Sequence, residues 1–347
     1  MFFAPMTVKL VRQKLGCLLF DVPRLLPALL FRDQWIRACN RGEGVKVEMG
    51  GVNTDVLGPY SSDLYVNHVF PRIGMMLMKH ALDQWPIKLT WGVETTKNPD
   101  ISFVIPHRGV ERLPLLRMTI GSIFSQRDVS VECIVVEQST IREVHGLPEG
   151  VRYIHLPHPE DAETWRKSWA FNVGVAEARA DIVVCHDGDI MVPLNYAQEI
   201  IRRLRGENYQ TAHLQRFLFS LDEISTENVI HTGGMNLTRP LDFIRQNWKG
   251  GTVAITKDAF KLVGGYDERF TGWTAEDREF YDRCLTLKGW RKGYLPFVHL
   301  WHPPQPTKFS EQRETNLKFS EEIMRIPREK RIERLRATQA LPGSSGG

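Results

Sequence analysis

The chain has 347 residues, of which 42% are hydrophobic and 25% are charged, and its 45 basic and 41 acidic side chains give a formal net charge of +4. This composition is typical of a soluble globular protein, and the length suffices for one large or two medium domains. It excludes a disordered chain and a small disulfide scaffold. The basic excess is small and evenly spread, so we expect no nucleic-acid partner.

Five cysteines lie far apart and in no CxxC spacing: Cys17, Cys39, Cys133, Cys185 and Cys284. This spacing predicts buried free thiols rather than zinc ligands or a redox pair. Free thiols favour a reducing compartment, so we expect a cytoplasmic protein.

Residues 1–98 are predicted to form an accessory region that is partly helical. Its beginning is basic and rich in leucine and phenylalanine, but charged residues interrupt it before a run of roughly 18 apolar residues develops, so no transmembrane helix is expected. Two interpretations remain: helices that pack on the main domain, or a surface-lying anchor that makes the protein peripheral at a membrane. Further along, the helical spacing of Ile73, Leu77 and Ala81 predicts a helix over 73–85.

From residue 99 onward, short apolar runs alternate with helical patterns. The runs 101–105, 131–136 and 182–185 predict buried strands, and residues 151–156 predict a further strand. The stripes at 116–124 and 165–176 predict helices between them. This order is typical of an α/β fold, Rossmann-like, with a mostly parallel sheet flanked by helices, here over residues 99–305. Residues 306–347 predict a helical segment, broken near Pro327, and a flexible tail.

In such sheets, ligands bind beyond the carboxyl ends of the strands. Asp187 and Asp189 form a DxD triplet shortly after the run 182–185, with His186 between the run and the triplet. Carboxylates at this edge suit a hard divalent cation that bridges the protein to a diphosphate, although a solvated turn has the same sequence. The chain contains neither GxGxxG nor GxxxxGK[ST], so a dinucleotide fold or a P-loop does not explain the phosphate site.

Three further motifs follow in the chain. Gly250-Gly251 precedes the apolar run 252–255, Trp273 lies shortly before the pair Glu276-Asp277, and His299 and His302 come last. The acidic pair opens a predicted helix, where it either serves catalysis or only favours the helix dipole. The two histidines are either metal ligands or structural side chains.

Taken in this order, DxD, GG-x-x-A, W-x-x-E-D and a late histidine resemble the inverting nucleotide-sugar transferases of GT-A fold. The similarity is to the β-1,4-galactosyltransferases and to bacterial chondroitin-polymerase-type glycosyltransferases, over about residues 100–305. The resemblance implies a hexosyltransferase of polysaccharide biosynthesis, with a nucleotide-sugar donor such as a UDP-sugar and a glycan or glycoconjugate acceptor. A mixed oxygen and imidazole site favours Mn²⁺, with Mg²⁺ as the alternative.

The resemblance also implies roles for single residues. Asp277 would be the general base, and Glu276 would hold acceptor hydroxyls. The metal ligands would be Asp189 and His302, with His299 as a further candidate. The nucleotide-sugar site would comprise Pro106, Arg108, Glu137, Arg166, Asp187, Gly250, Gly251 and Trp273.

Two other functions remain open at this point. A nucleotidyltransferase also places carboxylates and a metal at the edge of an α/β sheet, but it would release pyrophosphate and would have no use for Trp273. A carbohydrate-binding pseudo-glycosyltransferase would keep the fold without activity. The chain departs from the family at Thr274-Ala275, where galactosyltransferases have two glycines, and this should stiffen the loop.

Overall fold

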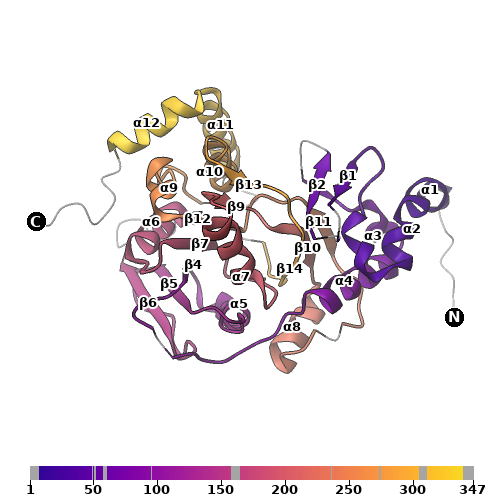
Figure 1. Cartoon of the computed structure of the whole chain (residues 1–347), viewed down its shortest axis with the longest axis horizontal. Coiled ribbons are helices and arrows are strands. Elements are labelled where there is room, and N and C mark those ends of the chain that lie inside the picture. The colour runs from indigo at the N-terminus through magenta and orange to yellow at the C-terminus, as the bar shows by residue number, and fades with distance from the viewer. Residues whose placement is uncertain are drawn as a thin grey trace, which may run out of the picture. The chain divides into compact units, whose positions relative to one another are not determined.

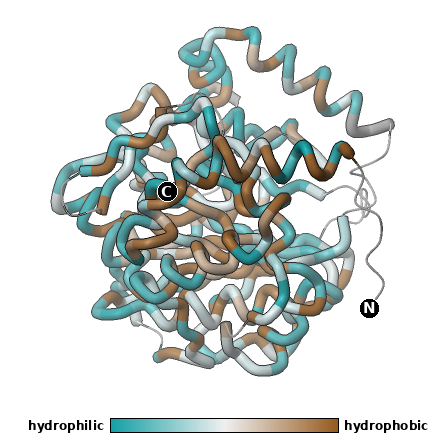
Figure 2. The backbone as a smooth tube through the Cα atoms, turned by 90° about the vertical axis from the view of Figure 1, so that its right-hand side faces the viewer, coloured by the Kyte–Doolittle hydropathy of each residue, from teal (hydrophilic) through white to brown (hydrophobic). Residues whose placement is uncertain are grey.

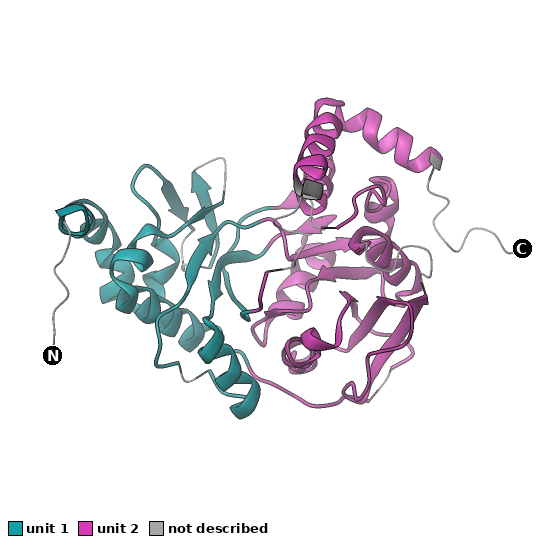
Figure 3. Cartoon of the chain, turned by 180° about the vertical axis from the view of Figure 1, so that it is seen from behind, with its two compact units in different colours: residues 1–87, 214–248, 291–301 teal, residues 88–213, 249–290, 302–347 magenta. Residues whose placement is uncertain are grey.

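The computed structural model describes residues 8–48, 50, 52–57, 61–94, 96–157, 165–235, 237–272, 275–304 and 311–338. The chain forms two compact units, each assembled from three stretches of sequence (Figure 3). Unit 1 comprises residues 1–87, 214–248 and 291–301, and unit 2 comprises residues 88–213, 249–290 and 302–347. The three domains predicted at 1–98, 99–305 and 306–347 stay a prediction, since these units follow packing rather than chain order.

A sheet forms the centre of unit 2 and confirms the predicted fold class (Figure 1). In the described part of this unit its order is β13-β9-β12-β7-β4-β5-β6. Strands β7, β4, β5 and β6 are parallel, whereas β12 runs antiparallel to both β7 and β9. The strands are β4 (Ile101–His107), β5 (Val131–Ser139), β6 (Val151–Pro157), β7 (Ile182–His186), β9 (Thr211–Ala212), β12 (Thr252–Thr256) and β13 (Gly289–Trp290).

Helices cover this sheet, whose central strands are buried on both faces. Every residue of β4 and β7 is buried. Helix α6 lies close against β4, where a Cβ on Gly174 would come within 2.2 Å of Val104 Cγ1. The helices and short elements of the unit before residue 300 are η3 (Val110–Arg112), α5 (Leu113–Phe124), α6 (Lys167–Glu177), β8 (Ile190–Met191), α7 (Tyr196–Ile201), η4 (Arg202–Gly206), α9 (Lys257–Leu262) and α10 (Glu276–Cys284).

Two C-terminal helices complete unit 2, with Pro327 between them: α11 (Glu311–Arg325) and α12 (Arg328–Thr338). Helix α12 is tied to α10 by buried ion pairs. Arg331 Nη1 lies 2.6 Å from Glu279 Oε1, and Arg283 Nε lies 2.8 Å from the same oxygen. Because Glu279 and Arg283 are buried, these pairs fix the position of α10 against α12.

Unit 1 joins the N-terminal residues to two later stretches of the chain. Four of its strands pair in the order β3-β11-β10-β14, and β1 and β2 form a separate antiparallel pair. The buried Arg216 on β10 donates to Ala38 O at 2.7 Å and to Ile36 O at 2.9 Å. The strands are β1 (Gly44–Val47), β2 (Thr54–Leu57), β3 (Ser62–Asp63), β10 (Gln215–Ser220), β11 (Phe243–Gln246) and β14 (Leu295–His299).

The helices of unit 1 include the one expected over 73–85, observed as α4. They are α1 (Val8–Gly16), the π-helix η1 (Cys17–Asp21), α2 (Val22–Leu30), the 3-10 helix η2 (Arg32–Arg37), α3 (Tyr65–Val69), α4 (Pro71–Gln84) and α8 (Glu223–Thr232). Figure 2 shows hydrophobic and hydrophilic stretches alternating along the tube of the chain. Within the described ranges, no helix combines the length and the apolar character needed to cross a membrane. All five cysteines are free, and Cys39 is half-buried while the other four are buried.

Candidate active site

The DxD triplet begins directly after β7, and Gly251 ties it to the start of α10. The Asp187 N–H donates to Gly251 O at 2.8 Å. The Gly251 backbone also hydrogen-bonds to the carboxylate of Asp277. Gly251 has φ +82°, a conformation that residues with a Cβ rarely adopt. This glycine therefore allows the backbone to bring two distant carboxylates to one place, and Gly250 precedes it in the chain.

Lys167, the first residue of α6, lies at the centre of these carboxylates. Its Nζ is 2.9 Å from Asp187 Oδ1, 3.2 Å from Glu276 Oε1 and 3.2 Å from Asp277 Oδ2. Burial alone would lower the pKa of Lys167, but the three carboxylates outweigh it and raise the pKa well above its ordinary value. The lysine is therefore a permanent cation. We call Lys167, Asp187, Glu276 and Asp277 the site cluster.

Burial acts in the opposite direction on the acids of the site cluster. It raises the pKa of Asp277, and the charge of Lys167 offsets part of that effect. Burial likewise raises the pKa of Asp187, to which the negative charge of nearby Asp189 adds. A carboxylate with a raised pKa is a stronger base than an ordinary aspartate.

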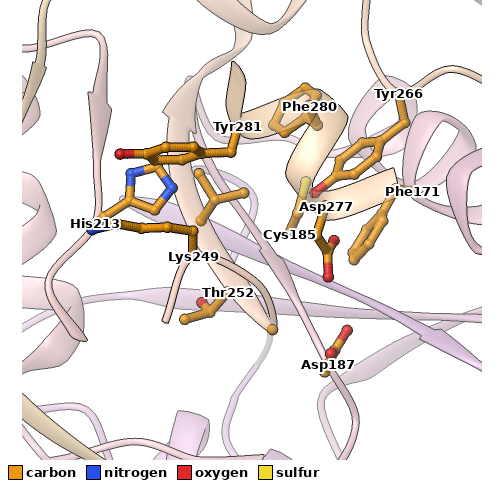
Figure 4. Close-up of a pocket in the computed structure, with 12 residues that line it drawn as sticks. Phe171, Cys185, Asp187, His213, Lys249, Thr252, Tyr266, Asp277, Phe280 and Tyr281 are labelled. Atoms are coloured by element: carbon orange, nitrogen blue, oxygen red, sulfur yellow. The ribbon is translucent and has the colours of Figure 1, made fainter. Parts of the chain in front are cut away.

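Asp187 and Asp277 line a small pocket in unit 2 (Figure 4). In the close-up Asp277 lies beside the rings of Phe171 and Tyr266, and Asp187 lies below it. Tyr266 stacks on Phe280 with ring centroids 4.0 Å apart and on Phe171 with centroids 4.8 Å apart. The stacked rings form an apolar wall beside Asp277.

Asp189 points to other partners than Asp187. Its Oδ2 lies 3.2 Å from His302 Nε2 and 3.3 Å from Arg112 Nη1. His302 Nδ1 is 2.9 Å from Pro303 O. A tautomer with its proton on Nδ1 would donate to that carbonyl and would present the Nε2 lone pair toward the carboxylate. An imidazole nitrogen and a carboxylate oxygen that face each other fit a divalent cation such as Mn²⁺.

The roles of the other predicted metal ligand and of the predicted loop aromatic stay predictions. His299 is the last residue of β14 and belongs to unit 1, so its role as a ligand stays a prediction. Trp273 lies outside the described residues.

Glu137, predicted to lie near the base or ribose, is buried and bonded to the protein. It accepts hydrogen bonds from the N–H groups of Glu143, at 3.0 Å, and Val144, at 3.3 Å, and from the Tyr153 hydroxyl. Burial would raise the pKa of Glu137, but these hydrogen bonds together lower it. Glu137 thus stays ionised and orders the loop after β5, while contact with a nucleotide stays a prediction.

The remaining predicted residues lie at the ends of neighbouring elements. Pro106 is buried near the end of β4, and Arg108 follows that strand and is half-buried. Arg166 directly precedes α6, and its N–H donates to Gln138 Oε1 at 2.7 Å. Their roles in donor binding stay predictions.

Sequence reasoning did not assign roles to Lys167 and Arg112, which contact the predicted acids. Lys167 stands in a polar cluster before the DxD triplet, but its partners in α10 lie 110 residues away, and no spacing rule connects them. Arg112 follows β4 without any motif. The available signal for these two contacts was a basic side chain close in sequence to the predicted strand ends.

The mixed sheet flanked by helices is similar to the fold of the GT-A glycosyltransferases. The model of the family described as "Glycosyltransferase like family 2" matches residues 102–289, which is more than half of the chain, and the chain belongs to this family. No curated protein matches the chain.

Two solved structures are similar in part. The mannosyltransferase PcManGT from Pyrobaculum calidifontis, in complex with GDP-Man and Mn²⁺, is 15% identical with a TM-score of 0.43, over 77% of this chain and 76% of that one. The catalytic domain of Drosophila β1,4-galactosyltransferase 7, in complex with xylobiose, is 17% identical with a TM-score of 0.36, over 58% of this chain and 71% of that one.

Proposed function

We propose that the protein transfers a hexose from a nucleotide-diphosphate donor, a UDP-sugar, to a hydroxyl of a glycan or glycoconjugate, with inversion and with a divalent metal. Polysaccharide biosynthesis is the setting that this chemistry fits. The observation that carries the proposal is the site cluster: Asp277 and Asp187 meet around Lys167 at the carboxyl end of β7, the edge where α/β sheets bind ligands. Membrane contact through the N-terminal segment is a separate proposal.

Asp277 acts as the general base in this scheme. Its carboxylate takes the proton of the acceptor hydroxyl while that oxygen attacks the anomeric carbon of the donor sugar. The bond from the anomeric carbon to the diphosphate breaks on the opposite face, and the nucleoside diphosphate leaves with the electron pair. One displacement of this kind inverts the anomeric centre. The raised pKa of Asp277 supports the role, because proton transfer is most efficient when the pKa of the base approaches the working pH.

The neighbours of Asp277 orient the reactants. Glu276, which begins α10, accepts hydrogen bonds from acceptor hydroxyls. The charge of Lys167 offsets part of the rise that burial causes in the pKa values of Asp187 and Asp277. Asp189 and His302 would hold the cation, which when bound stabilises the negative charge on the departing diphosphate. Arg112, at 3.3 Å from Asp189, fixes that carboxylate from a second direction.

The first experiment is a panel of UDP-sugars and GDP-sugars with a mixed glycan acceptor, with Mn²⁺, Mg²⁺ or EDTA, and with nucleoside diphosphate release as the readout. We expect release with a UDP-sugar and Mn²⁺, its loss in EDTA, and recovery when Mn²⁺ is added back. Asp189→Asn and His302→Ala should require more Mn²⁺ for half-maximal rate. The matched controls Asp258→Asn and His231→Ala, at exposed positions, should not.

Other outcomes would replace the proposal. Pyrophosphate in place of nucleoside diphosphate would indicate a nucleotidyltransferase. Donor binding without any release would indicate an inactive carbohydrate-binding relative. Full activity in EDTA would remove the metal from the mechanism, and retention of the donor's anomeric configuration in the product, measured by NMR, would exclude the single displacement.

A further inference from the structure

The N-terminal helices of unit 1 expose an apolar stripe to solvent. The stripe consists of Val8, Leu15, Leu19, Leu26 and Leu30, which are 74%, 52%, 64%, 44% and 69% exposed. They follow one another at intervals of seven and four residues, the spacing of one helical face. A different side of the same segment packs into unit 1, since Cys17, Leu25 and Ala28 are buried. The segment is therefore anchored while its apolar stripe is left open.

The exposure is concentrated in this one segment. Among the described residues, seventeen large hydrophobic side chains are exposed, and nine of them lie within residues 8–31. Isolated exposed leucines are ordinary, but a contiguous apolar patch of this kind marks a contact with a partner or a lipid surface.

The charge of the segment favours a lipid surface over a protein partner. Residues 8–32 contain five basic side chains and one acidic side chain. A pocket of about 320 Å³ beside the segment is lined by Arg12, Arg41, Asn40 and Tyr65, with Asp21 also at its wall. Arg41 Cζ lies 5.1 Å from the ring centroid of the exposed Phe20. Basic groups interleaved with apolar ones are complementary to anionic lipid headgroups above acyl chains. A second copy of the chain would instead oppose the same basic excess to itself.

The segment does not fit a membrane-spanning role. Charged side chains occur along its whole length, and no helix in the described ranges qualifies as a span. We propose that residues 8–31 lie flat in the surface of an anionic membrane, with the apolar stripe inserted below the headgroups and Arg12 and Arg41 at lipid phosphates. Such a contact goes beyond sugar transfer and does not depend on it.

Flotation of the full-length protein with vesicles tests the contact. We expect binding to phosphatidylcholine vesicles that contain phosphatidylglycerol, at least about tenfold stronger than to phosphatidylcholine alone, and weakening with salt. Leu19→Glu/Leu26→Glu should lower binding at least about tenfold, because it removes apolar insertion and adds repulsion. The control Ile224→Glu/Leu262→Glu introduces the same two negative charges at aliphatic side chains of similar exposure, 46% and 47%. It should bind the vesicles like the wild type.

The basic side chains are tested separately. Lys9→Gln/Arg12→Gln should lower binding to the anionic vesicles roughly 30-fold, while the control Lys97→Gln/Lys261→Gln should leave it unchanged. Absence of wild-type binding, equal binding to both vesicle types, or equal loss in the controls would overturn the proposal. A wild-type dimer that becomes a monomer in Leu19→Glu/Leu26→Glu would overturn it too and assign the stripe to a second copy. Nucleoside diphosphate release in solution should be unaffected by these changes, which separates this proposal from the proposed function.

Discussion

Helix α10 carries two groups of charged side chains that differ in their balance. Its first residues, Glu276 and Asp277, belong to the site cluster, where three acids share a single lysine. Its later residues belong to what we call the anchor cluster, which comprises Glu279, Asp282, Arg283, Arg328 and Arg331. There Glu279 contacts two arginines, and Asp282 lies 2.9 Å from Arg328 and also contacts Arg331.

The difference separates function from stability within one helix. In the anchor cluster each acid has a base, and the buried groups satisfy one another. In the site cluster the negative charge exceeds the positive charge, although burial disfavours it. Such an excess costs stability, and it is typical of a place where a ligand or a reaction supplies the missing partner. Separate substitutions in the site cluster and in the anchor cluster test whether each can be disturbed without the other.

The largest effect is expected for Asp277→Asn. Without the carboxylate no group takes the proton of the acceptor, so kcat should fall about 10²- to 10⁴-fold, while donor binding and the thermal midpoint stay near those of the wild type. Steady-state kinetics, donor calorimetry and thermal unfolding measure the three quantities. Asp258→Asn on α9 is the control. Unchanged turnover would end the assignment of Asp277 as the base.

Glu279→Leu should affect stability instead. It leaves Arg283 and Arg331 buried without their shared acid, and breaking a buried pair in this way costs about 3–5 kcal/mol. Urea unfolding measures the change, and the exposed Glu329→Gln on α12 should cost almost nothing. A loss below about 1 kcal/mol would mean that the anchor cluster does not hold α10.

The effect of Lys167 on the site cluster can be measured through the pH dependence of the rate. Asp277 is active when deprotonated, so activity falls as the pH drops through its pKa. Lys167→Met removes the cation that lowers that pKa, and the acidic limb of the pH–rate profile should therefore move to higher pH. Loss of orientation should also reduce kcat at neutral pH about 10- to 100-fold. Lys167→Arg keeps the charge and should restore the position of the limb. A limb that does not move would show that Lys167 acts only on folding.

The smallest effect is expected for Lys292→Gln in unit 1. Lys292 Nζ lies 2.8 Å from Glu48 Oε1, and both side chains are about a third exposed or more. An exposed ion pair of this kind contributes roughly 0.2–1 kcal/mol, so urea unfolding should change little. A change as large as that of Glu279→Leu would contradict the distinction between exposed and buried pairs.

Much of unit 2 could be predicted because its signals are local. Strands buried on both faces produce unbroken apolar runs, and β4, β5 and β7 coincide with such runs, whereas β6 is half-buried. The place of the DxD triplet after β7 follows from the same pattern. The antiparallel direction of β12 could not be predicted, since a run such as 252–256 carries no information about the direction of its neighbours.

The arrangement of the site depended on contacts that no local pattern encodes. Lys167 joins three acids from two other segments, and its charged neighbours are set by the tertiary fold alone. The segments that make up unit 1 could not be predicted for the same reason. Strand β10 pairs with β14 about eighty residues later, and a local hydrophobic pattern does not indicate such a distant partner. Family resemblance indicated Asp189 and His302, but their side-chain partners required coordinates.

The interleaving of unit 1 with the rest of the chain bears on any attempt to shorten the protein. Residues 1–87 do not form a detachable leader, since Trp35 packs 5.9 Å from Phe217 and Arg216 donates to Ile36 and Ala38. A truncation at residue 88 would remove the carbonyl groups that Arg216 bonds and the ring that packs against Phe217. Both residues would then lose these partners in the shortened protein. Expression trials should therefore retain the N-terminal eighty-seven residues, and a nascent chain can complete unit 1 only after residue 301 has been synthesised.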